Sequence, residues 1–169
     1  MKYERGEIYL KKGSLIFLIL ILIIGIFVGG NLHLNKKKPS NFYYTNLLAK
    51  NLTLYSDYEI KVLDTNFYKT ESLSAENIDI IKSFLKELRK PNFISKPVTL
   101  NTKPKYKIFF TFSDSQEKYV INIYDEEYIS IYPWDGNFPM DYINMKDIPL
   151  RYNLHSLGKN AFVKEPESK

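Results

Sequence analysis

The distribution of hydrophobic residues separates a short N-terminal part of the chain from a longer remainder. Residues 15–24 are all apolar, and no Lys, Arg, Asp or Glu occurs between Ser14 and Leu34. A helix over these 21 residues rises about 1.5 Å per residue and extends about 31 Å, close to the hydrocarbon thickness of a bilayer, about 30 Å. The pattern therefore predicts a transmembrane signal-anchor helix over residues 14–34.

Two other interpretations of this stretch are open. A cleaved signal peptide has the same layout of basic residues, an apolar segment and then small residues, here Val28-Gly29-Gly30. These small residues form a poor cleavage site, and the apolar segment is long for a signal peptide. A buried helix of a soluble protein would normally carry polar residues on one face, which this stretch lacks. We favour the uncleaved anchor and keep secretion after cleavage as the alternative.

The basic residues on each side of the anchor bear on its orientation. Residues 1–13 contain four Lys or Arg, and Lys36, Lys37 and Lys38 follow the anchor. Positive residues favour the cytoplasmic side, but here the difference between the two sides is small. The length of the segment after the anchor decides the orientation, because long domains are translocated largely regardless of charge. We expect a cytoplasmic tail at 1–13, a juxtamembrane linker at 35–41, an extracytoplasmic domain at 42–163 and a flexible tail at 164–169.

Alternation of apolar and polar residues predicts several strands in the domain. Tyr58–Leu63 begins with such alternation, and the turn residues 64–66 lead to a returning segment at 67–73. Three further strands, separated by short polar turns, are predicted at 105–112, 119–124 and 128–132. Short turns make neighbouring strands antiparallel, so these three form a meander. Residues 141–145 fit either a fourth strand or a turn of helix.

Helical spacing predicts one main helix in the domain. Ser74 is a favourable N-cap, an apolar stripe follows it, and Pro91 ends the helix, which covers about 75–89. The spacing is weaker in 42–54, and a short C-terminal helix starts near Asp147 and ends at Gly158. The fold class is therefore α+β, with an antiparallel sheet of four to six strands packed by one main helix.

Composition removes several classes of function. The net charge is +5, but residues 41–169 contain 17 basic and 17 acidic residues. A nucleic-acid binder carries an excess of basic residues on its folded domain, and this domain has no such excess, so we expect no nucleic-acid partner. The chain has no cysteine, which excludes disulfides, thiolate catalysis and a lipid attached to an N-terminal cysteine. The richness in Lys, Asn, Ile and Tyr is typical of proteins from AT-rich bacterial genomes.

The one compact cluster of candidate binding residues follows the third strand of the meander. It contains the only Trp of the chain. Exposed aromatic rings stack on sugars or peptide side chains, and nearby Asp and Asn residues supply polar contacts. A ligand-binding rim here would consist of Tyr132, Trp134, Asp135, Asn137, Asp141 and Tyr142. The alternative, which we favour, is a structured turn in which Trp134 plugs the end of a small core.

Metal binding and catalysis have less support. Asp135, Asn137 and Asp141 carry oxygen ligands for Ca²⁺, but an EF-hand loop needs more acidic residues and a bidentate Glu. Carboxylates near Glu126, Asp135 and Asp141 would suit a glycan hydrolase, although the three adjacent acids at 125–127 are typical of a solvated turn.

The other catalytic and cofactor motifs are missing from the sequence. His33 and His155 are the only histidines, so a multi-His metal site cannot form. No Gly-x-Ser-x-Gly motif and no glycine-rich phosphate-binding loop occurs. We therefore expect no metal, cofactor or catalytic residue, and keep the envelope hydrolase as the alternative function.

Four segments in this order resemble an uncharacterised bacterial family. They are Lys90–Ile94, Tyr106–Phe112, Tyr119–Tyr124 and Tyr128–Gly136, the last reading Tyr-Ile-Ser-Ile-Tyr-Pro-Trp-Asp-Gly. Members of the family look like membrane-anchored or lipoprotein domains of unknown function from anaerobic Gram-positive bacteria. The resemblance covers about residues 58–160. It implies a surface protein, and it implies no activity or functional residue.

Together these features predict a membrane-tethered extracytoplasmic domain of the bacterial envelope, held in the lipid bilayer through residues 14–34. Most aromatic residues alternate within predicted strands, so cross-strand pairing explains many of them. If both faces of the meander carry Tyr and Phe, one face is left for a partner. We expect that partner to be a protein or an envelope polymer. An accessory subunit that works only within a complex is a further alternative.

Overall fold

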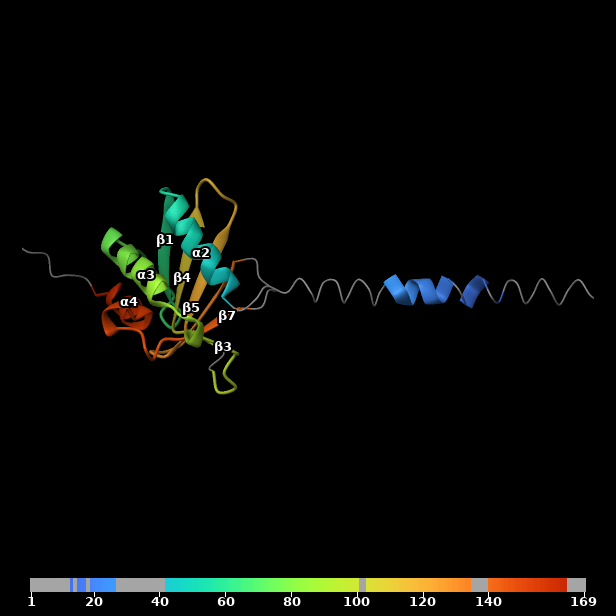
Figure 1. The fold of residues 1–169 in the computed structure, drawn as a ribbon. Coiled ribbons are helices and arrows are strands. Elements are labelled where there is room, and N and C mark those ends of the chain that lie inside the picture. Colours follow the sequence, from blue (N-terminus) through green and yellow to red (C-terminus); the bar gives the residue numbers. More distant parts are fainter. Residues whose placement is uncertain are drawn as a thin grey trace, which may run out of the picture. The chain divides into compact units, whose positions relative to one another are not determined.

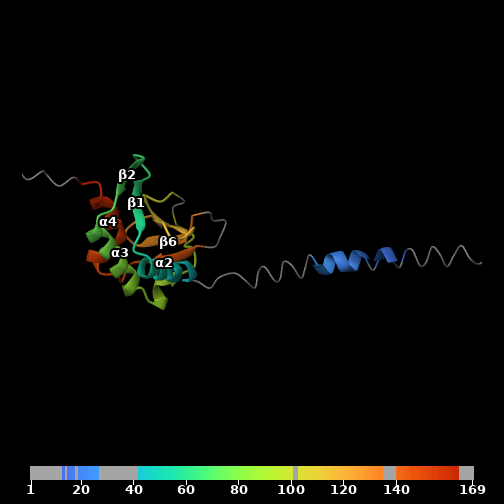
Figure 2. The ribbon, with the colours of Figure 1, turned by 90° about the horizontal axis from the view of Figure 1, so that it is seen from above.

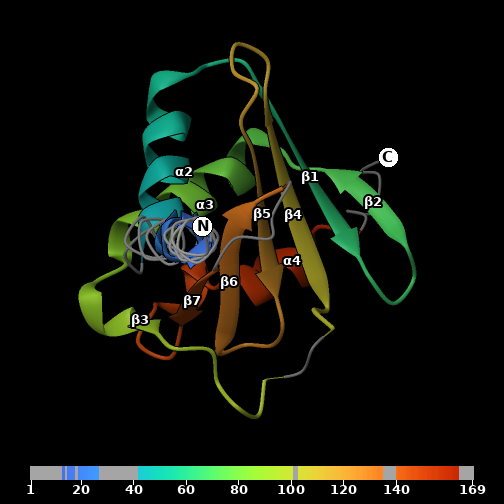
Figure 3. The same cartoon turned by 90° about the vertical axis from the view of Figure 1, so that its right-hand side faces the viewer.

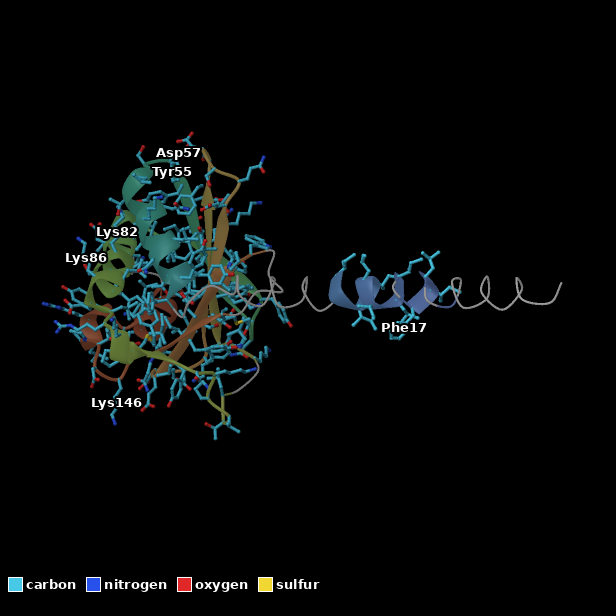
Figure 4. All side chains as sticks on the ribbon, turned by 45° about the vertical axis from the view of Figure 1, so that its right-hand side comes forward. Phe17, Tyr55, Asp57, Lys82, Lys86 and Lys146 are labelled. Atoms are coloured by element: carbon cyan, nitrogen blue, oxygen red, sulfur yellow. The ribbon has the colours of Figure 1, made fainter. Side chains whose placement is uncertain are left out.

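The computed structural model describes residues 13, 15–17, 19–26, 42–100, 103–134 and 140–163. The chain divides into two compact units, Met1–Pro39 and Ser40–Lys169. In the first unit the described residues are helical with exposed side chains, among them Phe17 (Figure 4). No helix within the described residues is long and apolar enough to cross a membrane. The predicted anchor includes residues 14, 18 and 27–34, and the predicted linker covers 35–41, all outside the described residues.

The second unit is an α+β domain, which confirms the predicted fold class (Figure 1). Its strands are β1 (Tyr58–Asp64), β2 (Lys69–Ser72), β3 (Phe93–Ile94), β4 (Tyr106–Phe112), β5 (Lys118–Ile123), β6 (Tyr128–Pro133) and β7 (Asp141–Asn144). Its helices are α2 (Tyr43–Leu54), α3 (Ala75–Glu87) and α4 (Leu154–Asn160), with 3-10 helices η1 (Lys90–Asn92) and η2 (Leu150–Tyr152).

The strands form one antiparallel sheet in the order β2-β1-β4-β5-β6-β7-β3. The sheet has seven strands where four to six were expected, because β3 was not predicted. β3 has two residues and pairs with β7 at one edge, while β2 forms the other edge (Figure 3). Residues 141–144 are a strand, which decides between the two interpretations of that segment.

The helices pack on one face of the sheet (Figure 2). Alternate strand residues point into this layer, and the largest of them that are fully buried include Ile108, Phe110 and Phe112 of β4. α2 contributes Leu48 and Leu52, and α3 contributes Ile81 and Phe84. The described part of the domain therefore has the predicted main helix, α3, together with α2 in the weakly helical segment 42–54 and the short C-terminal α4.

Local signals explain α3 better than the other helices. Ser74 accepts a hydrogen bond from the Asn77 N–H at 3.4 Å, as an N-cap does. The helix ends at Glu87, two residues before the predicted end, and the 3-10 helix η1 follows, where the Asn92 Oδ1 accepts a hydrogen bond from the Arg89 N–H at 2.8 Å. The C-terminal helix is divided into η2 and α4, and Gly158 lies inside α4 instead of ending it.

Candidate functional site

The sheet face opposite the helices is called here the open face, because no helix of the described domain packs on it (Figure 3). A row of paired residues crosses its centre: Lys107 of β4 pairs with Asn122 of β5, Asn122 with Ser130 of β6, and Ser130 with Tyr142 of β7. Each is next to at least one buried isoleucine of the core, so their side chains project to the other side of the sheet.

Two polar residues at the centre of the open face are buried. Asn122 is 5% exposed and Ser130 is 0% exposed, although no helix covers them. The Asn122 amide Nδ2 donates to the Ser130 Oγ at 3.4 Å and to the Tyr124 hydroxyl at 3.5 Å. The Tyr124 and Ser130 hydroxyls are 3.2 Å apart. The Asn122 Oδ1 is buried without a hydrogen-bond partner, which is costly unless something outside the domain satisfies it.

Two aromatic rings, those of Trp134 and Phe109, lie together on the open face. The Trp134 ring is 49% exposed, and its centroid lies 4.9 Å from that of Phe109. Phe109 belongs to β4 and Trp134 directly follows β6, so the two rings flank the buried Val120 of β5. The Lys118 ammonium lies 5.4 Å from the centroid of the Trp134 ring. An apolar ring and a positive charge are therefore held together at the surface.

Burial also changes the pKa of two tyrosine hydroxyls on this face. Burial raises the pKa of the Tyr132 hydroxyl, and a hydrogen bond from Asn122 opposes this shift in part. Burial likewise raises the pKa of the Tyr142 hydroxyl. Both side chains are half-buried. At neutral pH both hydroxyls therefore keep their protons, and each can donate a hydrogen bond as well as accept one.

The structure places the six residues of the predicted rim in three different situations. Tyr132, Trp134 and Tyr142 lie on or next to the open face. Asp135 and Asn137 lie outside the described residues. Asp141 is 2% exposed and lies on the helical side of the sheet, so it does not belong to the open face. The interpretation of Trp134 as a core plug is wrong, because half of its surface is exposed.

Asp141 caps helix α2 from a distant part of the sequence. Its Oδ2 accepts hydrogen bonds from the Thr45 N–H at 2.8 Å and the Thr45 hydroxyl at 2.9 Å. The residue at the N-cap position, Phe42, has a left-handed backbone and no side-chain cap of its own. Burial raises the pKa of Asp141, and the hydrogen bonds from Thr45 oppose that shift. The carboxylate therefore has a structural role at a helix N-terminus, which favours negative charge.

Of the three acids of the proposed hydrolase, Asp135 lies outside the described residues, and the other two, Glu126 and Asp141, lie apart. Glu126 is exposed in the turn between β5 and β6, where its nearest basic group is the His155 Nδ1 at 3.9 Å. The backbone carbonyl of the adjacent Glu127 accepts a hydrogen bond from the Met145 N–H. Met145 directly follows β7, and Asp141 is the first residue of that strand, about 13 Å away along the backbone. Paired carboxylates of glycosidases are about 5–9.5 Å apart.

The described residues contain no group of three or more His, Asp or Glu side chains arranged to hold a metal ion. His155 is half-buried, and burial lowers the pKa of its imidazole, with Lys105 adding to the effect. The imidazole is therefore neutral at pH 7, and its contact with Glu126 at 3.9 Å is a weak one.

The sequence-based reasoning missed Asn122, Ser130 and Phe109. A signal for the first two was present: each is a polar residue between two isoleucines, in the segments Ile121-Asn122-Ile123 and Ile129-Ser130-Ile131. Alternation of this kind predicts a second, more polar face of the sheet. It does not predict that this face would be buried by tyrosines.

The fold and the open face define a two-layer α+β domain with one helix-covered sheet face and one aromatic, polar sheet face. The chain belongs to the family described as domain of unknown function (DUF4883), whose model matches residues 38–158. This membership confirms the resemblance to an uncharacterised family.

One solved structure similar to this chain is described as "Crystal Structure of Putative Lipoprotein from Clostridium perfringens". It is 38% identical, has a TM-score of 0.67, and the match covers 75% of this chain and 99% of that chain. Comparison with curated proteins gave no significant match.

Proposed function

We propose that this protein is a membrane-tethered extracytoplasmic domain that binds a protein or a polymer of the bacterial envelope. The observation that carries the proposal is the open face. It combines an exposed Trp134, half-buried tyrosines and a buried Asn122 oxygen without a partner. Groups of this kind are typical of surfaces that recognise a ligand.

The membrane attachment is inferred from the relative and from the sequence. The Clostridium perfringens protein is described with the word lipoprotein, and lipoproteins are held by lipid on an N-terminal cysteine. This chain contains no cysteine, so the uncharged stretch 14–34 would provide the attachment instead. A linker at 35–41 spans at most about 25 Å when extended. The domain would therefore stay close to the membrane surface.

Binding is favoured over hydrolysis by the position of the carboxylates. Asp141 is engaged by Thr45 at the start of α2, and Glu126 is exposed in a distant turn. A general acid and its partner carboxylate must face the same substrate bond. The open face instead presents aromatic rings, hydroxyls and amides, groups that bind a ligand without catalysing a reaction.

Labelling of single cysteines tests the location of the domain. Because the chain has no native cysteine, an introduced one reacts alone with a membrane-impermeant maleimide. We expect Ser56→Cys, in the exposed segment between α2 and β1, to react on intact cells. Lys2→Cys should react only after permeabilisation, and the cysteine-free chain is the control. Protection of Ser56→Cys on intact cells would contradict the proposal.

Mass spectrometry of the membrane fraction tests whether the anchor is cleaved. The uncleaved chain has a mass of 19.9 kDa. Cleavage after Gly30 would remove the N-terminal segment and release the domain into the medium. We expect the full mass in the membrane fraction. Finding only the shorter form, outside the cells, would leave an extracytoplasmic domain without the tether.

A further inference from the structure

We propose that the open face is a binding site for an anionic glycan, a polymer of sugars that carry carboxylate or phosphate groups. This inference rests on the proposed function and names the ligand class for the same face. Three features of the described residues carry it: the sign of the charges, the exposed rings, and the buried amide without a complete set of partners.

The charges of the open face are mostly positive. Lys61, Lys107 and Lys118 project from β1, β4 and β5, against one acid, Glu59. Glu59 is already paired with Lys61 at 2.7 Å. Within the described residues, Lys107 and Lys118 form no salt bridge. Two unpaired ammonium groups on adjacent strands therefore remain to attract a negatively charged ligand, although the domain as a whole is neutral.

The rings suit the apolar faces of sugars. Trp134 is 49% exposed and is supported by Phe109, which keeps the indole in place. A pyranose ring has an apolar face formed by its C–H groups, and such a face packs well on an aromatic side chain. Lys118 lies over the same indole, at 5.4 Å from its centroid. A sugar beside this ring would place an acidic substituent within reach of the Lys118 ammonium.

The buried amide provides directional contacts. The Asn122 Nδ2 has hydroxyl partners, but its Oδ1 has none. Exchanging the two amide positions would leave the nitrogen without an acceptor instead, so one end of the amide is unsatisfied in either orientation. Sugar hydroxyls both donate and accept hydrogen bonds, and can satisfy either end once the side chains that cover the amide move aside, because the oxygen itself is not exposed. Lys107 lies directly beside Asn122 in the paired row.

A bilayer surface rich in anionic lipid is the main competing ligand, because lysines and an exposed Trp also suit a membrane interface. The central polar group distinguishes the two. A membrane surface would contact the outer rings and lysines without requiring an amide buried to 5% exposure. The glycan is therefore favoured, and anionic vesicles are included in the test.

The emission of Trp134 provides a direct readout, because this is the only Trp in the chain. The full-length protein is held in neutral phosphatidylcholine nanodiscs and titrated with polygalacturonate, a carboxylated glycan, and with phosphomannan, a phosphorylated glycan. Dextran serves as the uncharged glycan, polyphosphate as the anion without sugars, and phosphatidylglycerol vesicles as the anionic lipid. We expect a shift in emission with at least one anionic glycan, and binding of dextran and polyphosphate about tenfold weaker or undetectable.

Two matched double variants locate the binding. Lys107→Gln/Lys118→Gln should weaken glycan binding about tenfold, because it removes both unpaired charges of the face. Lys86→Gln/Lys146→Gln makes the same change of charge at exposed positions elsewhere on the domain (Figure 4). It should change the affinity less than about twofold. Asn122→Ser should also weaken binding, with circular dichroism confirming that the variant is folded.

Several results would overturn the inference. The inference is wrong if neither anionic glycan binds, or if dextran binds as tightly as the anionic glycans. It is also wrong if the vesicles bind more tightly than the glycans, or if both double variants lose the same amount of glycan affinity. The outcome of the cysteine labelling, which tests the proposed location, does not depend on whether a glycan binds. If Ser56→Cys is labelled from outside and no glycan binds, the tethered domain stands and only the ligand class is wrong. If Ser56→Cys is protected, the envelope location itself is wrong.

Discussion

At the residue scale, the most informative side chain is Asp141, because it is an acid buried without a basic partner among the described residues. Its carboxylate replaces the cap that Phe42 cannot provide, and it links the start of β7 to the start of α2. These two segments are 96 residues apart at the contact with Thr45. Removing the carboxylate should therefore affect the docking of a whole helix.

Asp141→Ala should lower the free energy of unfolding by about 1–2 kcal/mol, the usual cost of losing a helix cap. The Thr45 N–H and hydroxyl would lose their acceptor in a buried position. Urea denaturation followed by circular dichroism measures the change. Asp147→Ala, at an exposed position of the turn after β7, is the control and should leave the stability unchanged. Equal stability of the two variants would mean that Asp141 does not cap α2.

Glu117 predicts a pH dependence of stability. Its carboxylate accepts hydrogen bonds from the Tyr119 hydroxyl at 2.6 Å and from the Asn51 Nδ2 at 2.5 Å. These bonds lower the pKa of Glu117 in the folded state. The stabilisation is therefore fully present above the pKa of the unfolded chain, and it is lost as the pH falls through the lower, folded value.

The stability difference between the wild type and Glu117→Gln should accordingly be larger at pH 7 than at pH 3. Urea denaturation at a series of pH values measures this difference. Glu87→Gln, at the exposed end of α3, is the matched control and should show no such trend. A difference that stayed constant with pH would show that the hydrogen bonds of Glu117 do not depend on its charge.

At the scale of elements, local patterns predicted the long strands and α3, and they failed where distant contacts decide. β3 is two residues long and is held by pairing with β7, with Asn92 donating to the Asn144 carbonyl. Nothing within residues 93–94 predicts it. Alternation predicted β4, β5 and β6 because each has a core face of large apolar residues.

The candidate site was predictable only in part, for a related reason. Trp134 and its neighbouring tyrosines are visible in the sequence as a cluster of aromatic residues. Asn122 and Ser130 are eight residues apart and meet only through the pairing of β5 with β6. Both also contact the hydroxyl of Tyr124, which directly follows β5. A sequence pattern cannot show this, because it describes each strand alone.

Gly158 gives a prediction about the packing of two elements. It lies inside α4, and a Cβ at this position would be 2.8 Å from the Cγ and Cδ2 of Tyr106 on β4. In an exposed helix Gly→Ala stabilises by about 1 kcal/mol. Here the overlap should reverse the sign, with Gly158→Ala destabilising by about 1–3 kcal/mol.

Thermal or urea denaturation measures the sign of this change. Asn160→Ala, at an exposed position of the same helix, is the control and should be neutral or slightly stabilising. A stabilised Gly158→Ala variant would show that α4 and β4 can separate enough to admit a methyl group. The contact between them would then not be the reason why residue 158 is a glycine.

At the scale of the whole molecule, the chain combines two parts with opposite surface chemistry. The described residues of the first unit are helical and expose large apolar side chains, among them Leu20, Ile21 and Ile23. The second unit buries its apolar core between the sheet and the helices, and its open face carries the exposed Trp134 ring beside a buried polar centre. Exposed apolar side chains of this kind support the proposal that this segment is the membrane anchor.

The anchor is tested by placing charges in it. Leu20→Arg/Ile23→Arg should move the protein out of the membrane fraction, since each arginine near the centre of a span costs about 2.5–3.5 kcal/mol. Leu20→Ala/Ile23→Ala alters the same positions without charge and should remain membrane-bound. Carbonate extraction followed by immunoblotting measures the distribution, and an unchanged Trp134 emission shows that the domain is still folded. If the arginine variant remained in the carbonate-resistant membrane fraction, residues 14–34 would not be the anchor, and the tether would have to be sought elsewhere in the protein.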